Sequence, residues 1–421
     1  MAQSSPPPEH VVVVGAGMVG LSTAWYLQRA GIQVTVVDRT GVAAGSSWGN
    51  AGWLAPALTL PLPEPAILAT GVRAALSPSS PVYVPVRLDP RLWRWLVAFA
   101  RHCTPGRWER AMRVFNQANA DALDAYDDLA GDGLVEPIKP AEPFLAAFTS
   151  EADRATLLHE LDQVARTGGY ADFHLLERDE LHALEPAFGD TVSHGMRLDG
   201  QRFINPGRFV AAVAEAIEKA GGHILADVDV ERVDADATSA RVVAADGRVI
   251  SADHVVIANG SWLDRLARPH GVRHHVQAGR GYSFTVHPEH VPSGPVYFPA
   301  QRVACTPLGA PEEGLRVAGM MEFRSPDAAL DPRRIKAIVD AARPMFTDID
   351  WSARTDEWVG ARPCTADGLP LVGPTRTPRV HVAGGHGMWG IALGPLTGRL
   401  LADQIISGST PDLLKAFNPL R

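Results

Sequence analysis

The chain has 421 residues, of which 46% are hydrophobic and 20% are charged, and its net charge is −8. This length exceeds one simple core and predicts two closely packed domains, while the acidic balance gives no reason to expect a nucleic acid as partner. Three cysteines, Cys103, Cys305 and Cys364, lack CxxC or metal-ligand spacing, so we expect neither a disulfide framework nor a metal site.

The start of the chain and its hydropathy predict a soluble, cytoplasmic protein. Residues 1–10 are polar and rich in proline, so we expect a disordered tail and not a signal peptide. No segment reaches the roughly 18 consecutive apolar residues that a membrane-spanning helix needs.

The next segment has the pattern of a dinucleotide-binding turn. In order, it contains an apolar strand at 11–14, the turn Gly15-Ala16-Gly17-Met18-Val19-Gly20, a helix over 21–30, a strand at 34–37, and Asp38. The three glycines allow a tight turn, close approach of a pyrophosphate, and close packing of helix on strand. The acid suits a ribose diol and disfavours a 2′-phosphate, so the pattern indicates FAD or NAD and not NADP.

Further elements follow from periodicity, glycine and proline. A small, polar segment at 45–52 suits close backbone approach, and the proline-rich segment 56–90 predicts an extended excursion over the surface. Helices are expected at 92–103, 107–130, 150–167, 208–220, 332–342 and 394–406. Strands are expected at 223–233 and 247–257, both returning to the first sheet, across 276–323, and at 379–382.

Four later segments have patterns suited to ligand contact. A strand ends in Ala258-Asn259-Gly260, where small residues let a loop lie against a ligand. Residues 360–373 place Arg362 before a tight turn, residues 384–390 form a glycine-dense turn before the last helix, and residues 280–283 contain Tyr282.

In this order the segments resemble the FAD-dependent D-amino acid oxidase family of amine and amino-acid oxidoreductases, closest to its bacterial D-amino acid dehydrogenase branch. The most specific match is Gly-x-Arg-Pro-x-Thr-x-Asp-Gly-x-Pro-x-x-Gly at 360–373, and Ser-x-x-x-Asn-Ala-Gly at 46–52 is a second. The resemblance covers nearly the whole chain. Since most family members use FAD, it implies FAD rather than NAD as the cofactor.

The resemblance also implies a fold and its domains. We expect an α/β protein with a doubly wound, Rossmann-like FAD-binding domain of the glutathione-reductase type and an inserted α+β substrate domain. The FAD-binding domain would comprise 11–85, 200–275 and 360–421, and the substrate domain would comprise 86–199 and 276–359.

Site residues carry over from the resemblance position by position. The implied cofactor-binding residues are Gly15, Gly17, Met18, Val19, Gly20, Asp38, Arg39, Ser46, Ser47, Asn50, Ala51, Gly52, Val228, Ala258, Gly260, Trp262, Gly385, His386, Gly387 and Met388. Arg362 matches the arginine that clamps the substrate carboxylate, a role that suits its planar, two-pronged donor.

The chain departs from the family pattern in three places. The usual Thr-Pro-Asp is Thr365-Ala366-Asp367, and Trp53 stands where dehydrogenase relatives often have glutamine. Gly360 aligns with the flavin-linking cysteine of covalent relatives, so we expect non-covalent FAD.

Several residues have two interpretations. Arg362 could be a surface ion-pair residue, but its place before Pro363 favours the clamp. Tyr282 either bonds the substrate beside Arg362 or is an ordinary, half-buried strand tyrosine. His386 is either a general base or a turn residue that gives its backbone to the flavin, and we favour the turn because hydride transfer from a neutral amine needs no dedicated base.

The aromatic residues of 92–103 also allow two interpretations. Trp93, Trp95 and Phe99 could touch a membrane surface peripherally. We favour packing on the substrate domain, because the segment has the apolar stripe of a core-facing helix.

We therefore expect FAD-dependent oxidative deamination of a small amino acid, a D-amino acid as first choice. Hydride transfer from the α carbon to flavin N5 would give an imino acid and then a keto acid. Three alternatives stay open: an oxygen-using oxidase of glycine, sarcosine or a proline derivative, an NAD-dependent dehydrogenase, and a non-catalytic flavin-binding subunit. The electron acceptor, quinone or oxygen, stays open as well.

Overall fold

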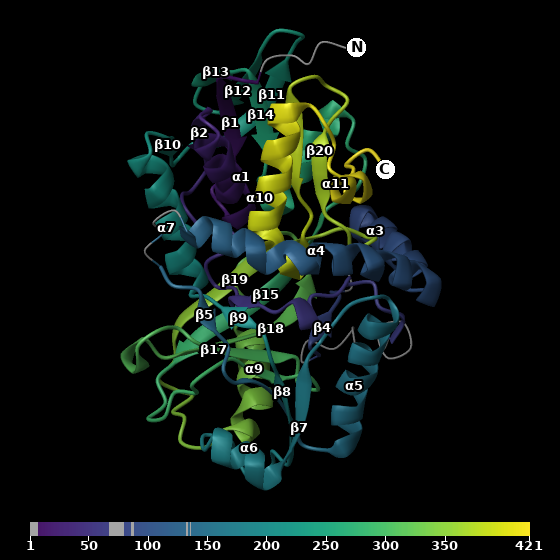
Figure 1. Ribbon diagram of the computed structural model, residues 1–421, viewed down its shortest axis with the longest axis vertical. Helices are drawn as coiled ribbons and strands as arrows, with labels where there is room; N and C mark the ends of the chain where they lie inside the picture. The colour runs from purple at the N-terminus through teal and green to yellow at the C-terminus, as the bar shows by residue number, and fades with distance from the viewer. Residues whose placement is uncertain (1–6, 67–79, 86–87, 132–133, 135) are drawn as a thin grey trace.

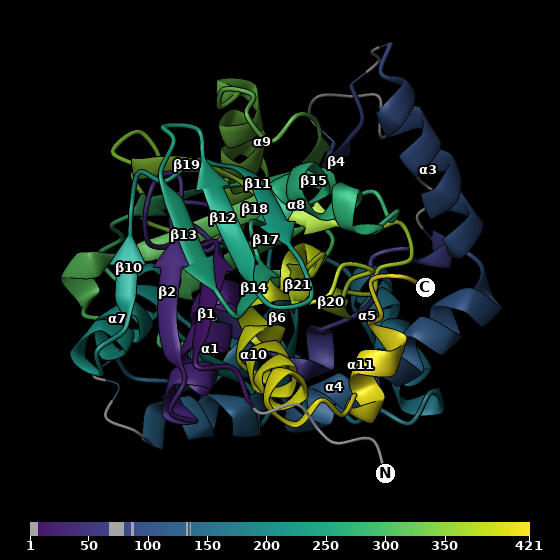
Figure 2. The same ribbon diagram turned by 90° about the horizontal axis from the view of Figure 1, so that it is seen from above.

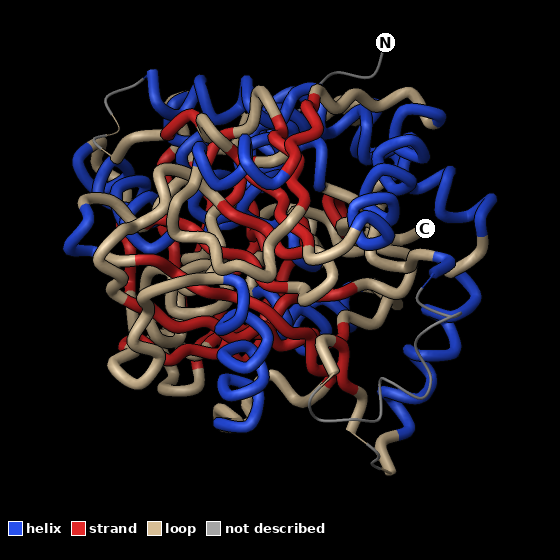
Figure 3. Tube along the Cα trace, turned by 90° about the horizontal axis from the view of Figure 1, so that it is seen from below, coloured by secondary structure: helices blue, strands red, loops and turns tan. Residues whose placement is uncertain are grey.

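The computed structural model describes residues 7–66, 80–85, 88–131, 134 and 136–421. Two large sheets dominate it, one in the upper and one in the lower half of Figure 1, and the long helix α4 (Pro105–Gly131) runs across the middle. Strands fill the centre of the molecule and helices surround them (Figure 3). The predicted α/β class is confirmed.

The upper sheet contains the predicted dinucleotide-binding strands. Its order is β10 (His223–Leu225), β2 (Gln33–Val37), β1 (His10–Val14), β14 (His254–Ile257), β21 (Val380–Gly384) and β20 (Leu371–Pro374), and all neighbours are parallel except β20 and β21. The central strands β2, β1, β14 and β21 are short valine-rich runs buried on both faces, which is typical of parallel strands. Three helices cover one face: α1 (Met18–Arg29), α7 (Pro206–Lys219) and α10 (Gly390–Ser407).

A separate antiparallel sheet covers the other face. It consists of β11 (Val230–Ala235), β12 (Ala240–Ala244) and β13 (Val249–Ala252). The prediction that 223–233 and 247–257 both return entirely to the first sheet is therefore wrong for β11 and β13. Exposed residues between the two buried valines of β11 suit a sheet with one solvated face, whereas the continuous apolar run of β14 suits burial on both faces.

The lower sheet has nine strands. Its order is β19 (Thr355–Cys364), β15 (Gln277–Val286), β18 (Leu315–Phe323), β17 (Val303–Pro307), β16 (Val296–Phe298), β6 (Phe144–Phe148), β8 (His194–Leu198) and β7 (Phe173–Glu177), with β4 (Val82–Tyr83) paired to β18. Helix α9 (Pro332–Ala342) packs on one face. Helices α5 (Glu151–Arg166) and α6 (Arg178–Leu184) lie at the far end (Figure 1).

The remaining elements of the described residues are short. A short sheet joins β3 (Trp53–Leu54), β9 (Arg202–Phe203) and β5 (Lys139–Pro140). Short α-helices are α8 (Leu263–Ala267) and α11 (Asp412–Ala416), and 3-10 turns are η1 (Pro56–Leu58), η2 (Gly260–Trp262), η3 (Arg268–His270), η4 (Pro311–Glu313), η5 (Arg343–Met345) and η6 (Gly387–Trp389).

Helix α3 (Pro90–His102) lies at the edge of the molecule (Figure 2). It begins at the N-cap Asp89, whose carboxylate accepts two backbone N–H bonds, and Trp95 and Phe99 are buried against Phe323 of the lower sheet. For these two aromatic residues the contact agrees with the favoured prediction of packing on the substrate domain, because β18 lies within the predicted 276–359 segment. Trp93 points outward and is 46% exposed.

Two predictions about the first 90 residues need correction. His10 opens β1, so the predicted tail 1–10 extends too far, and residues 1–6 lie outside the described residues. Within the proline-rich segment, Ala57, Leu58 and Thr59 are buried, because η1 packs against α4 and the Thr59 hydroxyl donates to the Ala55 carbonyl. The expected surface excursion is therefore wrong there, while 67–79 and 86–87 lie outside the described residues.

The predicted domain boundaries stay a prediction. One strand bears on them: β4 lies within the predicted 11–85 segment but pairs with the lower sheet through Met321. Across the described part of the chain, no helix is long and apolar enough to cross a membrane.

Helices α1 and α10 are in close contact at two glycines of α10, Gly394 and Gly398. A Cβ added at Gly398 would lie 2.6 Å from the carbonyl carbon of Ser22, and one at Gly394 would lie 2.8 Å from Cγ of Met18. Side chains at these positions would push the helices apart, so the glycines set the distance between them.

We expect Gly398→Ala to lower the free energy of unfolding by about 1–3 kcal/mol, because overpacking outweighs the helix propensity gained from alanine. Chemical denaturation measures the change. Gly106→Ala in α4 is the matched control, because its added Cβ meets no atom within 4 Å and should not destabilise the protein. Equal effects of the two substitutions would contradict this account.

Candidate functional site

A pocket lies where the carboxyl ends of β1, β14 and β21 meet the starts of α1 and α10. This is the edge of a parallel sheet at which doubly wound folds bind ligands. Twelve of its lining residues are predicted site residues: Gly17, Met18, Val19, Ser46, Ser47, Asn50, Ala258, Gly260, Arg362, His386, Gly387 and Met388.

Two glycines behind the pocket lining, Gly15 and Gly20, allow close backbone contacts. A Cβ at Gly15 would lie 2.4 Å from the Ala258 carbonyl oxygen, and one at Gly20 would lie 2.0 Å from the Gly15 carbonyl oxygen. Gly15 also has a φ of +119°, which side chains rarely allow. These two glycines do not line the pocket, but they let the turn lie against the end of β14.

The start of α1 points polar groups into the pocket. The Met18 N–H donates to the Ser47 hydroxyl at 3.2 Å, and a Cβ at Gly17 would lie 3.3 Å from that hydroxyl oxygen. The first turn of α1 contains no acidic residue. Its free N–H groups and positive dipole end therefore suit an anion such as a pyrophosphate.

Asp38 organises the neighbouring turns. One carboxylate oxygen accepts the Ala16 N–H at 2.9 Å, and the other accepts the N–H groups of Thr40 and Gly41 at 2.9 and 3.0 Å. The Val228 N–H donates to the Asp38 carbonyl at 2.9 Å, so the predicted ribose and adenine positions lie side by side.

Arg39 and Trp262 form a cluster outside the pocket. The Arg39 guanidinium carbon lies 3.8 Å from the Trp262 ring centroid, a cation–π contact. Asp327, which follows β18, accepts bonds from both side chains, at 3.4 Å from Arg39 and 3.0 Å from the Trp262 indole N–H. The structure thus joins two predicted site residues through a residue that the sequence did not suggest.

Three further predicted residues lie beyond the pocket lining. A Cβ at Gly52 would lie 2.2 Å from the Ile204 carbonyl oxygen, and one at Gly385 would lie 2.8 Å from Cγ2 of Thr365. Both glycines have a positive φ, which residues with a Cβ rarely adopt. They therefore set the direction of the chain next to the pocket. Ala51 is half-buried between Asn50 and Gly52.

His386 turns its ring into the protein. The ring is 2% exposed, and its Nε2 lies 2.8 Å from the Thr397 hydroxyl on α10. Burial lowers the pKa of His386 to about 4, so the imidazole is neutral at neutral pH. This placement gives no support to a general-base role.

Arg362 reaches the pocket from β19. Its Nη1 donates to the Met320 carbonyl at 2.7 Å, and the guanidinium lies directly over Gly281, where a Cβ would be 2.3 Å from Nη2. Burial lowers the pKa of Arg362. Among the described residues no carboxylate pairs with this guanidinium, so its other N–H donors are available to a ligand.

Tyr282 does not share this pocket. Arg362 lies over Gly281, and the next residue on β15 points to the opposite face of the sheet, where Tyr282 is 0% exposed and donates to Glu322 at 2.6 Å. The suggested bond from Tyr282 to a ligand beside Arg362 is therefore wrong, and the residue is a fully buried strand tyrosine.

Five pocket residues were absent from the predicted site: Pro363, Ala383, Gly384, Gly390 and Ile391. Helix α10 begins at Gly390 and not near 394, so its first turn joins the lining. The rule that ligands bind at the carboxyl ends of parallel strands would have identified Ala383 and Gly384 at the end of β21.

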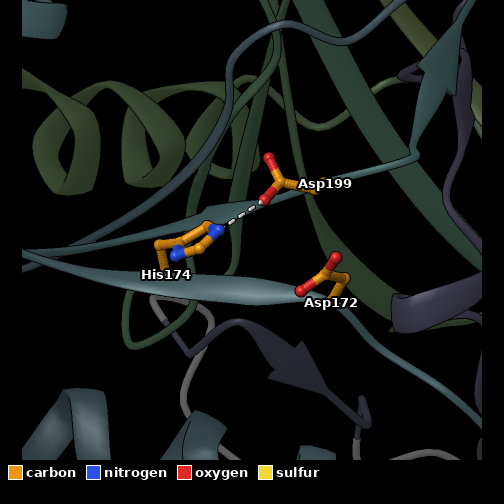
Figure 4. A group of neighbouring side chains, drawn as sticks. All are labelled: Asp172, His174 and Asp199. Carbon is orange, nitrogen blue, oxygen red and sulfur yellow. Dashed lines mark ion pairs between the residues drawn. The ribbon is translucent and has the colours of Figure 1, made fainter.

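One group of possible metal ligands contributes no residue to the pocket lining. Asp172, His174 and Asp199 offer ligand atoms within 4.8 Å of one another, and His174 lies 3.2 Å from Asp199 (Figure 4). Arg197 already donates to Asp199 at 2.9 Å. Because the group is largely exposed and partly neutralised, it gives no argument for a bound ion.

The comparison with protein families decides the class. The family model described as FAD dependent oxidoreductase matches residues 10–404. The chain belongs to this family. Membership confirms the predicted family resemblance, the oxidoreductase class and FAD as the cofactor, and it decides for FAD over NAD.

Relatives in the family span nearly the whole chain. The D-amino acid dehydrogenase of Agrobacterium fabrum is 29% identical over 415 residues, which cover 96% of this chain and 97% of the relative. The D-amino acid dehydrogenase of Cereibacter sphaeroides is 31% identical over 413 residues, which cover 96% and 93%.

Two solved structures share the fold. Glycine oxidase from Geobacillus kaustophilus matches with a TM-score of 0.73 and 20% identity over 99% of both chains. L-alpha-glycerophosphate oxidase from Mycoplasma pneumoniae, solved with FAD bound, matches with a TM-score of 0.72 and 17% identity over 94% of both chains. The glycine cradle and the N-terminus of α1 fit the same dinucleotide in this chain.

The buried neutral state of His386 predicts a pH dependence of stability. The unfolded chain binds a proton near pH 6.5 and the folded chain near pH 4, so stability present above pH 6.5 is lost as pH falls towards 4. The loss from this residue is at most about 3 kcal/mol. We expect His386→Gln to lose less stability than wild type between pH 7 and pH 4.5 in denaturation with excess FAD. Equal losses would contradict the assignment.

Proposed function

We propose that the protein catalyses FAD-dependent oxidative deamination of a small amino acid, with D-amino acids as the expected substrates. The proposal rests on one observation. Arg362, a cation with no carboxylate partner among the described residues, shares the pocket of the glycine-rich turns. The names of the relatives from Agrobacterium fabrum and Cereibacter sphaeroides support the substrate class.

We infer that Arg362 binds the substrate carboxylate. A guanidinium presents parallel N–H donors that match the two oxygens of a carboxylate, and a partly desolvated site strengthens such a bond. The Met320 carbonyl accepts a hydrogen bond from Nη1, and the remaining N–H donors of the guanidinium are available to the ligand. Two-point binding would fix the orientation of the α carbon, which supplies rate through positioning.

The cofactor would be held mostly by backbone groups. Gly15, Gly17 and Gly20 would admit the pyrophosphate to the N-terminus of α1, and Asp38 would accept the ribose hydroxyls. The remaining predicted contacts stay as proposed from the sequence, including Val228 at the adenine and residues 385–388 at the ring. Bound FAD supplies the acceptor for the hydride removed from the α carbon.

The reaction balances with water as the second reactant. The α C–H bond and one N–H bond of the neutral amine are lost as a hydride and a proton, which leaves an imino acid. Water then adds to the imine carbon and releases ammonia, giving a keto acid; an N-substituted amine would release the substituted amine instead. His386 supplies no proton in this scheme, because its ring is engaged with Thr397.

The electron acceptor and the cellular location are also proposals. Quinone and oxygen are both open as the acceptor that reoxidises the flavin. We expect a cytoplasmic protein, with peripheral membrane contact as a further proposal for the exposed side of α3, where Trp93 and Val97 point outward.

Anaerobic mixing of the purified holoenzyme with D- and L-amino acids, glycine, sarcosine and proline derivatives tests the substrate class. We expect D-amino acids to bleach the flavin absorbance and later admission of air to show whether oxygen is the acceptor. Bleaching by glycine, sarcosine or proline derivatives but not by D-amino acids, together with oxygen uptake, would instead establish the alternative of an oxygen-using oxidase of those substrates.

We expect Arg362→Lys to raise KM for the amino acid by about ten- to a hundredfold, because lysine keeps the charge but loses the two-pronged donor. Steady-state kinetics measures the change. Arg248→Lys is the matched control at an exposed arginine that pairs with Asp246. An Arg362→Lys protein with wild-type KM would contradict the assignment of Arg362 as the carboxylate clamp.

We also propose that FAD is bound without a covalent link, since glycine occupies position 360. A Cβ there would lie 2.0 Å from the Trp358 ring, so the position has little room for a cysteine. Acid precipitation of the purified protein should release all yellow colour into the supernatant. Flavin that stays with the pellet would contradict this proposal.

A further inference from the structure

A β-bulge lies beside Arg362. Pairing on either side of Gly281 shows that this single residue of β15 faces two residues of β18, Met320 and Met321. Met320 has a φ of +65°, in the left-handed region that residues with a Cβ rarely adopt. Such strained positions persist only where surrounding contacts hold them, and they gather at functional sites.

The bulge supplies the contacts of Arg362. The carbonyl of the strained Met320 accepts the Nη1 donor at 2.7 Å, and the Met321 sulfur lies 3.8 Å from the same nitrogen. Opposite the bulge, Gly281 leaves the space over which the guanidinium lies. The position of the guanidinium therefore depends on the backbone conformation at the bulge.

A buried network holds the bulge from the other face of the sheet. Arg280 and Tyr282 flank Gly281, and both donate to the same oxygen of Glu322, at 3.1 and 2.6 Å. Glu322 directly follows Met321, and all three network side chains are fully buried. Burial and the bond to Glu322 raise the pKa of Tyr282, so the phenol keeps its proton and remains a donor.

We propose that the Arg280–Glu322–Tyr282 network positions Arg362 for the substrate by holding the Met320–Met321 bulge. This rests on the proposed function, in which Arg362 binds the substrate carboxylate. The three network residues touch no substrate; they act through the bulge. Removing one donor lets β15 and β18 shift at Gly281, so that the Met320 carbonyl turns away and the guanidinium loses its fixed direction.

Tyr282→Phe tests the proposal with the smallest change, because it removes one hydroxyl and keeps the ring. We expect KM for the amino acid and Kd for acetate or benzoate, read from the flavin spectrum, to rise about tenfold or more, since small misplacements of a binding group have such effects. The FAD content should change far less. Glu322→Gln should give a larger effect, and if it does not fold, Tyr282→Phe decides alone.

Tyr26→Phe is the matched control. The Tyr26 phenol also donates one buried bond, to the Ala125 carbonyl at 2.9 Å, but it lies on α1 away from Arg362. It should lower Tm without changing KM or the Kd for acetate. If Tyr282→Phe behaves in the same way, the network is merely structural and the inference is overturned.

The two proposals fail in different ways. A wild-type holoenzyme whose flavin no amino acid reduces, but whose spectrum acetate or benzoate still perturbs, would contradict the proposed function alone. Wild-type and Tyr282→Phe proteins with equal KM and equal Kd for acetate would contradict the positioning role alone. A wild-type flavin that neither amino acids nor carboxylates affect would overturn both.

Discussion

Close backbone contact at the first glycine-rich turn is the constraint on which the site depends. Gly15 and Gly20 bring the turn against the end of β14, at distances that a single methyl group would prevent. This contact points the start of α1 at the pocket, and Gly394 and Gly398 then bring α10 to the same place. Two helix N-termini thus converge on the pocket, and their backbone dipoles add to the positive charge of Arg362 in its lining.

Much of this arrangement could be predicted from the sequence because the governing signals are local. The Val11–Val14 run, the glycine spacing and Asp38 lie within one short segment, and each has one physical interpretation. Helix α9 was predicted at its observed bounds, and α7 within two residues, because Asn205 and Asp331 cap the helices and proline follows each cap. The pocket lining likewise follows from motifs at the ends of strands.

The remainder depends on pairing between distant strands, which a single sequence does not show. Tyr282 illustrates this: its hydroxyl donates to Glu322, 40 residues away on β18, and the local pattern of 280–283 does not show the pairing that brings the two residues together. The start of α10 was misplaced for a related reason. Pro395 cannot donate to the Ile391 carbonyl as a helical residue would, and the Tyr126 hydroxyl from α4 donates to it instead, at 2.7 Å.

The pocket is lined partly by strand residues and partly by turn residues, and this difference has an evolutionary consequence. In the proposed function, recognition of the carboxylate depends on a strand backbone and on a network behind the sheet, where most substitutions disturb several partners at once. Other parts of the lining, such as Asn50 and Met388, belong to turns. Under the proposed function, single substitutions in those turns can change the side-chain preference of descendants of this protein, while binding of the carboxylate is inherited unchanged.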